Sequence, residues 1–372
     1  MRSQTHLISP PDSSMSSQLA SFHYGSAGVG KKVYIQAALH ADEVPGMLVS
    51  QFLRKELDAL DAAGKISGEI ILVPAANPIG LSQAIIGAPF GRFDLTTGTN
   101  FNRAYKHVAD DLKLSLAGLL TADADANVAL IRAHARASVA TWSPATDAES
   151  LKKTLLGMAI DADIVLDLHC DNEAVMHIYA GTPLADAAGP LSAYMGAHAV
   201  LLALEAGDEP FDEACSRLWW DLAAHFGPAY PIPPACLSTT VELRGEMDVS
   251  YALAQQDARG LLNFLAHAGV LAMTPDPMPA PLCAPTPLEG VEPLAAPHNG
   301  VLVFLKNLGD KVRPGDAIAD LIDPVSGATT TLKTTVAGVF FARTAHRHLL
   351  RGMQVGKIAG PVAFRAGKLL SQ

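Results

Sequence analysis

Short apolar runs alternate with helix-like segments along the first two-thirds of this sequence. The apolar runs lie at residues 33–39, 69–78, 163–169, 197–204 and 238–243. Segments with helical character lie between or beside several of them, at 147–160, 213–226 and 250–267. Strands that alternate with helices favour an α/β fold, in which a largely parallel central sheet carries helices on both faces. The Ala-rich stretch 105–145 predicts a helical insertion over one edge of that sheet.

The composition changes after about residue 272. Eight of the 24 residues from 274 to 297 are proline, which excludes a helix and predicts a semi-rigid linker, or the entry to an edge strand, at 273–297. Short β-like runs separated by Gly, Pro and Asp turns follow at 298–372. These turns indicate a small all-β domain. We therefore expect a first domain at 1–272 that the linker joins to this second domain.

Charge and hydropathy limit the partners of the chain. Its 372 residues include 27 Lys and Arg and 37 Asp and Glu, for a formal net charge of −10. This balance argues against a nucleic-acid partner, since sequence-independent binding needs dense Lys and Arg to neutralise phosphates. No apolar run approaches the roughly 18 residues of a membrane span, so we expect no membrane partner. Association into a homo-oligomer stays open.

The N-terminus and the cysteines bear on localisation. The first 18 residues contain one Arg and no apolar core, so they predict a loosely ordered arm and no secretory signal. The four cysteines lie far apart, without a CxxC pair: Cys170, Cys215, Cys236 and Cys283. This pattern is typical of reduced thiols and favours a cytoplasmic protein over a disulfide framework.

Two of the apolar runs end in residues that can bind a metal. ALHADEVPG places His40 and Glu43 three residues apart, so one tight turn can bring both side chains to a single ion. DIVLDLH places His169 at the end of a later run. Two His and one Glu, with water as the fourth ligand, form a catalytic rather than a structural zinc set. Open α/β sheets also build their sites at the carboxyl ends of strands.

A third run, TTVELRGEMD, carries Glu242 late in a strand. This carboxylate could act as general base on a zinc-bound water, whose pKa the metal lowers towards roughly 7. Arg244 lies two residues later, so both side chains point to the same face of a regular strand. Two roles for Arg244 stay open, namely substrate binding and an ion pair that holds Glu242.

The motif GTNFNRAY contains the neighbouring residues Asn102 and Arg103. An arginine binds a carboxylate bidentately, and a neighbouring amide can share that carboxylate. Arg92, upstream in FGRFDL, is a candidate second cation. Each motif alone also fits an ordinary structural role, such as a surface turn or an ion pair at a helix start. Their occurrence together, in this order, favours an active site.

The ordered set HADEVPG, NFNR, DLH and VEL resembles the succinylglutamate desuccinylase/aspartoacylase family of the zinc carboxypeptidase-like group, over residues 30–270. The resemblance implies a three-layer α/β/α sandwich around a mixed sheet. The tail is similar to the barrel-like biotinyl/lipoyl domain that some bacterial members carry. Its turn DPVSGAT has no lysine, so we expect a structural domain that covers the site or forms an oligomer interface, and no carrier.

The resemblance also implies roles for single residues. The zinc ligands of the family match His40, Glu43 and His169. Its carboxylate-binding pair matches Asn102 and Arg103, its carbonyl-polarising arginine matches Arg92, and its general base matches Glu242. The form NFNR replaces the DLNR that is common in the family, which leaves the substrate open.

The implied activity is hydrolysis of an amide by metal-activated water, with one Zn²⁺ per chain. A deacylase that acts on an N-acyl amino acid, a small molecule, is the first hypothesis. A zinc carboxypeptidase that acts on a small or unusual peptide is the alternative enzyme, since both use the same residues. A non-catalytic zinc-binding module is the third hypothesis, and it predicts no hydrolysis of any amide.

Overall fold

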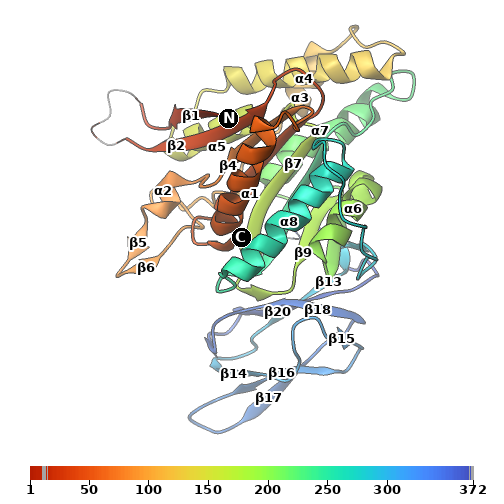
Figure 1. Cartoon of the computed structure of the whole chain (residues 1–372). Coiled ribbons are helices and arrows are strands. Elements are labelled where there is room, and N and C mark those ends of the chain that lie inside the picture. Colours follow the sequence, from red (N-terminus) through yellow and green to blue (C-terminus); the bar gives the residue numbers. More distant parts are fainter. Residues whose placement is uncertain (11–13, 15, 368, 370–372) are drawn as a thin grey trace.

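The computed structural model describes residues 1–10, 14, 16–367 and 369. Its centre is a nine-stranded mixed sheet, shown with its surrounding helices in Figure 1. In spatial order the strands are β1 (Arg2–Leu7), β2 (Gln18–Gly25), β4 (Glu69–Val73), β3 (Lys32–Ala37), β7 (Ile164–Asp171), β11 (Leu237–Gly245), β9 (His177–Gly181), β10 (Ala199–Ala203) and β12 (Thr286–Pro287). Each of the five predicted apolar runs overlaps one of these strands.

The middle of the sheet consists of parallel strands. β4, β3, β7 and β11 lie side by side and run in the same direction. β7 is buried at every position from Ile164 to Cys170, because helices cover both faces of the sheet and leave its side chains no solvent-facing side. Parallel strands bring their carboxyl ends to one edge, so the ends of β3, β7 and β11 meet there.

Alternating side chains of β3 explain why both faces are covered. Tyr34 packs into one apolar core, whereas Val33 and Ile35 pack into another on the opposite face. The core around Tyr34 includes α3 (Ala109–Ser115), α4 (Ala124–Thr141), α5 (Asp147–Ala159) and α7 (Phe211–Phe226). The other core includes α1 (Pro45–Ala62), α6 (Ala185–Met195) and α8 (Tyr251–His267). Among the described residues, no helix has both the length and the apolar character that a membrane span requires.

The helix predicted at 147–160 shows how local sequence sets its own boundary. The Thr146 side chain accepts the backbone N–H of Glu149 at 3.1 Å, and thereby caps the first turn of α5. The predicted insertion at 105–145 contains α3 and α4. Helix α2 (Pro78–Leu81) and the hairpin β5 (Ala84–Ile85) and β6 (Ala88–Pro89) lie between β4 and this region.

Residues after 290 form two antiparallel sheets. One sheet contains β13 (Val291–Ala295), β20 (Gln354–Ala359), β18 (Gly338–Arg343) and β15 (Lys311–Val312). The other contains β17 (Thr329–Lys333), β16 (Ala317–Ile322), β14 (Gly300–Phe304) and β19 (His348–Leu349). The short strand β8 (Glu173–Ala174), which follows β7, pairs with β18. The C-terminal sheets are therefore joined to the sheet edge where the parallel strands end.

Three features correct or complete the expectations. Residues 2–7 form β1, antiparallel to β2, so the expected loose arm is wrong there; positions 11–13 and 15 lie outside the described residues. β9 runs antiparallel to β11, and β2 runs antiparallel to both β1 and β4, so the sheet is mixed, as the family resemblance implied. The segment 273–297, expected as a linker or an edge-strand entry, contributes β12 to the edge of the large sheet and β13 to a C-terminal sheet.

Candidate active site

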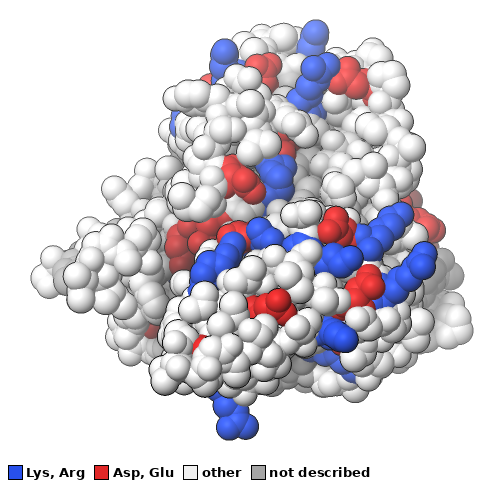
Figure 2. All heavy atoms as spheres, turned by 90° about the horizontal axis from the view of Figure 1, so that it is seen from below, with Lys and Arg blue, Asp and Glu red and all other residues white. Residues whose placement is uncertain are grey.

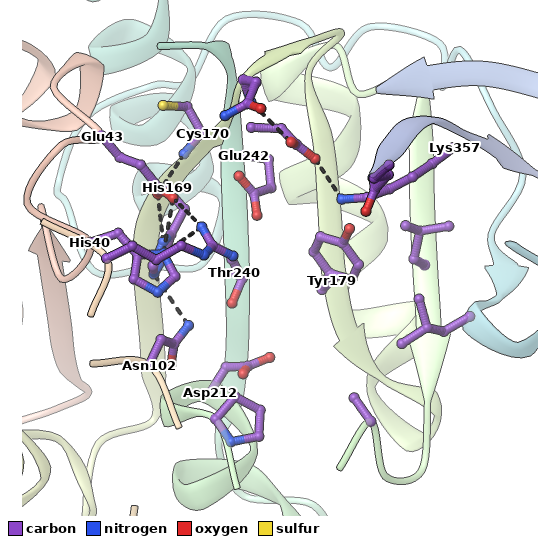
Figure 3. A pocket seen from close by; sticks show the side chains of 18 of the residues that line it. His40, Glu43, Asn102, His169, Cys170, Tyr179, Asp212, Thr240, Glu242 and Lys357 are labelled. Atoms are coloured by element: carbon purple, nitrogen blue, oxygen red, sulfur yellow. Dashed lines mark hydrogen bonds and ion pairs between the residues drawn. The ribbon is translucent and has the colours of Figure 1, made fainter. Parts of the chain in front are cut away.

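A cavity of about 370 Å³ lies at the carboxyl ends of β3, β7 and β11 (Figure 3). Its lining combines the loops that follow these strands, the start of α7 and the segment 343–357 of the C-terminal sheets. Figure 2 shows the face that these sheets form, with Lys and Arg side chains across its middle and Asp and Glu among them. The cavity thus lies between the two parts of the chain that the sequence distinguishes.

His40, Glu43 and His169 meet inside this cavity. Their side chains are at most 4% exposed, and their potential ligand atoms all lie within 4.8 Å of one another. His40 Nδ1 is 2.9 Å from Glu43 Oε1, and His169 Nδ1 is 2.7 Å from Glu43 Oε2. Both imidazoles therefore direct Nδ1 towards one carboxylate, as the sequence motifs predict for ligands of a shared ion.

The contacts of His40 determine which of its nitrogens carries the proton. Asn100 Oδ1 accepts the backbone N–H of Asn102 at 2.8 Å, which fixes the orientation of this amide. The same oxygen is 2.7 Å from His40 Nε2, so Nε2 is the donor. Burial and the charge of Arg92 lower the pKa of His40 to about 4, which keeps the ring neutral and Nδ1 unprotonated.

The neutral ring creates a contact that calls for a cation. His40 Nδ1 and Glu43 Oε1 are both acceptors, yet they face each other at 2.9 Å. Arg92 Nη1 donates to both atoms, at 3.2 and 3.1 Å. Two acceptors at this separation repel each other, and in the metal-free structure the Arg92 guanidinium is the cation that bridges them. The donor set of two imidazoles and one carboxylate also fits a zinc ion.

His169 is held from its other side by a buried carboxylate. Its Nε2 lies 3.0 Å from Asp167 Oδ2, and Gln36 Nε2 donates to Asp167 Oδ1 at 2.9 Å. Burial alone would lower the pKa of His169, but Asp167 and Glu43 raise it well above its ordinary value. Burial raises the pKa of Glu43, but His40 and His169 hold it well below its ordinary value. The metal-free site is therefore a charged cluster that an ion would reorganise by displacing a proton.

A close backbone approach places Arg92 beside this group. A Cβ atom at Gly91 would lie 2.4 Å from the backbone nitrogen of Asp42, so only glycine allows this contact. The Ala41 N–H donates to Gly91 O at 3.1 Å and joins the two loops. Arg92 then reaches Glu43 with a side chain that is 36% exposed, as a group that faces the cavity requires.

Glu242 lies next to His40, Glu43 and His169, the candidate metal group, because of strand register. It pairs with His169 across β11 and β7, and it lines the same cavity. Its Oε2 is buried without a hydrogen-bond partner in the described structure. Burial and the negative charge of Glu43 raise its pKa to about 8. The side chain is thus a carboxylate with an elevated proton affinity and a free oxygen, close to the predicted ligands.

Asn102 and Arg103 also line the cavity. Asn102 Oδ1 accepts the N–H of Phe211 at 2.8 Å, which attaches the motif to the start of α7. Its Nδ2 is 3.5 Å from His169 Nε2. Arg103 Nη1 donates to Asn102 O at 2.6 Å. The structure therefore brings the predicted carboxylate-binding pair to the metal group.

Arg244 is a correction to the sequence analysis. It has a φ of 69°, and the pairing of β11 with β7 shifts register between Glu242 and Gly245. The regular alternation of side chains therefore breaks between Glu242 and Arg244. The Arg244 guanidinium binds both carboxylate oxygens of Asp257 in α8, at 3.1 and 2.5 Å, and Arg244 does not line the cavity. Neither expected role, substrate binding or an ion pair with Glu242, agrees with this placement.

Sequence reasoning missed several residues of the site. Lys357, from β20, donates to Asp171 Oδ2 at 2.7 Å and reaches the cavity beside Tyr179 (Figure 3). Asp171 lies two residues after His169, so strand periodicity could have indicated it. Asn100 belongs to the NFNR motif and could have been considered as a partner of a ligand. No local pattern marks Lys357, because its position depends on how the C-terminal sheets meet β7.

Comparisons with known proteins cover most of the chain. The family model for the succinylglutamate desuccinylase/aspartoacylase catalytic domain matches residues 29–268. A family protein from Shewanella amazonensis SB2B is 27% identical, with a TM-score of 0.81 over 96% of this chain and 98% of that one. One from Shewanella frigidimarina NCIMB 400 is 25% identical, with a TM-score of 0.83 over 96% and 97%. One from Rhodobacter sphaeroides shares the fold at 17% identity, with a TM-score of 0.64 over 97% and 96%. A search of the curated proteins gives no significant match.

Proposed function

The chain belongs to the succinylglutamate desuccinylase/aspartoacylase family, and from that premise we propose that it is a zinc-dependent deacylase of N-acyl amino acids. The observation that carries the proposal is the buried group His40, Glu43 and His169 beside the unpartnered oxygen of Glu242. An isolated ion-binding site would not need a carboxylate of raised pKa in the same cavity. A non-catalytic module is therefore disfavoured.

The proposed cofactor is one Zn²⁺ held by His40, Glu43 and His169. When bound, zinc would lower the pKa of a coordinated water towards about 7 and polarise a carbonyl oxygen. Ligand type favours zinc, and the outer ring nitrogens are held by the hydrogen bond of His40 to Asn100 and by the ion pair of His169 with Asp167.

The other cavity residues would orient the substrate and move protons. Glu242 accepts the proton of the attacking water and returns it to the leaving amine. Arg92 faces the site where negative charge develops on the carbonyl oxygen. Asn102 and Arg103 hold a substrate carboxylate, so that the amide carbonyl stays at attack distance.

The C-terminal sheets would contribute to amide hydrolysis and would carry out no separate reaction. We propose that they form a barrel of the biotinyl/lipoyl type without a carrier function. The turn between β16 and β17, at 323–328, has no lysine. Lys357 and Arg343 from these sheets instead line the cavity, which supports a role in closing the active site.

The cysteines support the proposal that the protein is located in a reducing compartment, the cytoplasm. Cys170, Cys215, Cys236 and Cys283 are all free thiols, and the first three are buried. An unpaired set of this kind suits a reducing compartment. Burial raises the pKa of Cys170 and Cys215, so neither is a ready nucleophile.

The test is an assay of the zinc-loaded protein against N-acyl amino acids and dipeptides. We expect hydrolysis of at least one N-acyl amino acid, loss of activity after chelation and recovery when zinc is returned. Cleavage of dipeptides alone would favour the carboxypeptidase hypothesis. Absence of all amide hydrolysis by the zinc-loaded protein would contradict the proposal.

Asn100→Ala is expected to weaken zinc binding by about 10- to 100-fold, because it removes the acceptor that fixes His40. Competition with a chromogenic chelator measures this change directly. Asn100→Asp keeps an acceptor at the same position and serves as the matched variant, with affinity closer to that of the unaltered chain. Equal zinc affinity in Asn100→Ala would show that Asn100 does not orient His40.

A further inference from the structure

Two adjacent carboxylates at the start of α7 have no role in the reaction proposed above. Asp212 and Glu213 are each 8% exposed, and both line the cavity. In Figure 3, Asp212 lies on the same side of the cavity as Asn102. These are two buried acidic groups inside the substrate cavity, and the metal group does not include them.

Neither carboxylate forms a salt bridge within the described residues, although Arg103 and Arg217 exert a favourable charge on Asp212 and Glu213, respectively. Glu213 Oε1 accepts the N–H of Ala206 at 2.5 Å, whereas Oε2 is buried without a partner. Asp212 forms no salt bridge with a Lys or Arg in the part of the chain that the structure describes. Arg217, one turn further along α7, instead forms its ion pairs with Glu205, Glu209 and Asp221.

Burying a carboxylate without a counterion is unfavourable. Burial and the nearby charge of Asp167 raise the pKa of Asp212 to about 6, although Arg103 acts in the opposite direction. Burial and Asp212 raise the pKa of Glu213 to about 8. The protein therefore keeps two destabilising acids in its substrate cavity, which a cationic ligand would compensate.

The position of Arg103 specifies that ligand further. Its guanidinium lies close enough to interact electrostatically with Asp212 and Glu213, and it lines the same cavity. A carboxylate-binding group beside an ammonium-binding pair is complementary to the head of an amino acid with both groups free. In an Nα-acylated amino acid, the α-nitrogen is an uncharged amide and cannot use the acidic pair.

We propose that Asp212 and Glu213 bind the free α-ammonium group of the substrate, so that the substrate class is a diamino acid acylated on its side-chain nitrogen. This inference rests on the proposed function, which supplies the amide hydrolysis. The α-carboxylate binds Asn102 and Arg103, and the side chain places its amide at the metal group. Amide cleavage adds water across the C–N bond, and yields a carboxylic acid and the free diamino acid.

Matched substrates test the proposal. The test substrates are diamino acids with one to four side-chain methylene groups, acetylated on the side-chain nitrogen. Each is compared with two related compounds. The deamino partner lacks the α-amino group, and the Nα-acetyl isomer carries the acetyl group on the α-nitrogen. We expect kcat/KM to be about 10- to 100-fold higher for the side-chain derivative that fits than for its deamino partner, the worth of a hydrogen bond to a charged group. In Asp212→Asn this ratio falls towards one. Glu213→Gln, the second variant, lowers it in the same direction.

Glu205→Gln is the matched control, since Glu205 is 55% exposed and does not line the cavity. It removes one negative charge near α7 and should keep the ratio. An effect of Asp212→Asn on folding alone would lower kcat/KM equally for both partners and would overturn the proposal. Preference for the Nα-acetyl isomers would also overturn it, while the deacylase function would stand.

Calorimetry with free diamino acids separates this inference from the proposed function, because binding needs no turnover. Diamino acids should bind the unaltered chain about 10- to 100-fold more tightly than their deamino analogues. This preference should vanish in Asp212→Asn. If no amide is hydrolysed at all, the proposed deacylase function is wrong. The dissociation constants of the diamino acid and of its deamino analogue then decide by themselves whether the ammonium site exists. Equal affinities for both compounds overturn it.

Discussion

Glu242→Gln is expected to lower kcat by about 10²- to 10⁴-fold, the range that a positioned general base contributes. The amide side chain has nearly the same shape as the carboxylate but cannot accept a proton. Zinc should remain bound, because Glu242 is not part of the group His40, Glu43 and His169. The KM should change little, since the proposed substrate anchors are elsewhere in the cavity.

Steady-state kinetics with metal analysis of the same preparation measure both effects. Full zinc content together with a large loss of kcat would assign proton transfer to Glu242. Loss of zinc in Glu242→Gln would instead place Glu242 in the metal site. Turnover equal to that of the unaltered chain would exclude it as the base.

The pKa of Glu242 also sets the sign of the pH dependence. A general base works in its deprotonated form, so kcat/KM should rise as the pH increases through the pKa of Glu242. Burial and Glu43 raise this pKa to about 8 in the metal-free chain. A bound cation would act in the opposite direction and move the rising limb to lower pH.

The sequence specified this site well because strand order and chemistry coincide in it. His40, Glu43 and His169 follow apolar runs whose parallel pairing was predicted, and parallel strands end at one edge. Glu242 could be placed beside them because its own run belongs to the same alternation. Strand order, together with the family resemblance, was therefore sufficient for the residues that follow β3, for His169 on β7 and for Glu242 on β11.

Sequence reasoning failed where geometry depends on a single backbone angle or on distant contacts. The positive φ of Arg244 breaks the alternation of its strand, and periodicity assumes regular geometry. Lys357 and Asp171 are 186 residues apart, and no local pattern records such a pairing. In the sequence, Asp212 and Glu213 resemble the acidic residues that are common at the start of a helix. Only the tertiary structure shows that they are buried in the cavity.

His169→Ala is expected to abolish both zinc binding and activity. The substitution removes one of three ligands and leaves Glu43 and Asp167 without the imidazole between them. Two ligands hold zinc far more weakly than three, so a purified sample should contain no stoichiometric metal. Metal analysis of the unaltered chain and the variant, purified without chelator, measures the difference.

Lower folding stability of the variant is also expected, because it leaves the buried carboxylate of Asp167 without its ion-pair partner and leaves Glu43 with Arg92 as its remaining arginine contact. The decisive quantity is therefore the change in melting temperature on adding zinc to each metal-free protein. Free zinc at about 100 times its Kd adds about 2.7 kcal/mol to the free energy of unfolding of a chain that binds it only when folded. The unaltered chain should show this increase and His169→Ala should not.

His177→Gln is the matched control, because His177 is a fully buried histidine on the neighbouring strand β9 and does not belong to the metal group. Its Nδ1 donates to the carbonyl of Val175 at 2.8 Å, and its buried Nε2 has no hydrogen-bond partner among the described residues. This variant should keep its zinc and its zinc-dependent rise in melting temperature. Stoichiometric zinc in His169→Ala would place the ion elsewhere in the chain. No zinc in the unaltered chain would remove the basis of the hydrolase proposal.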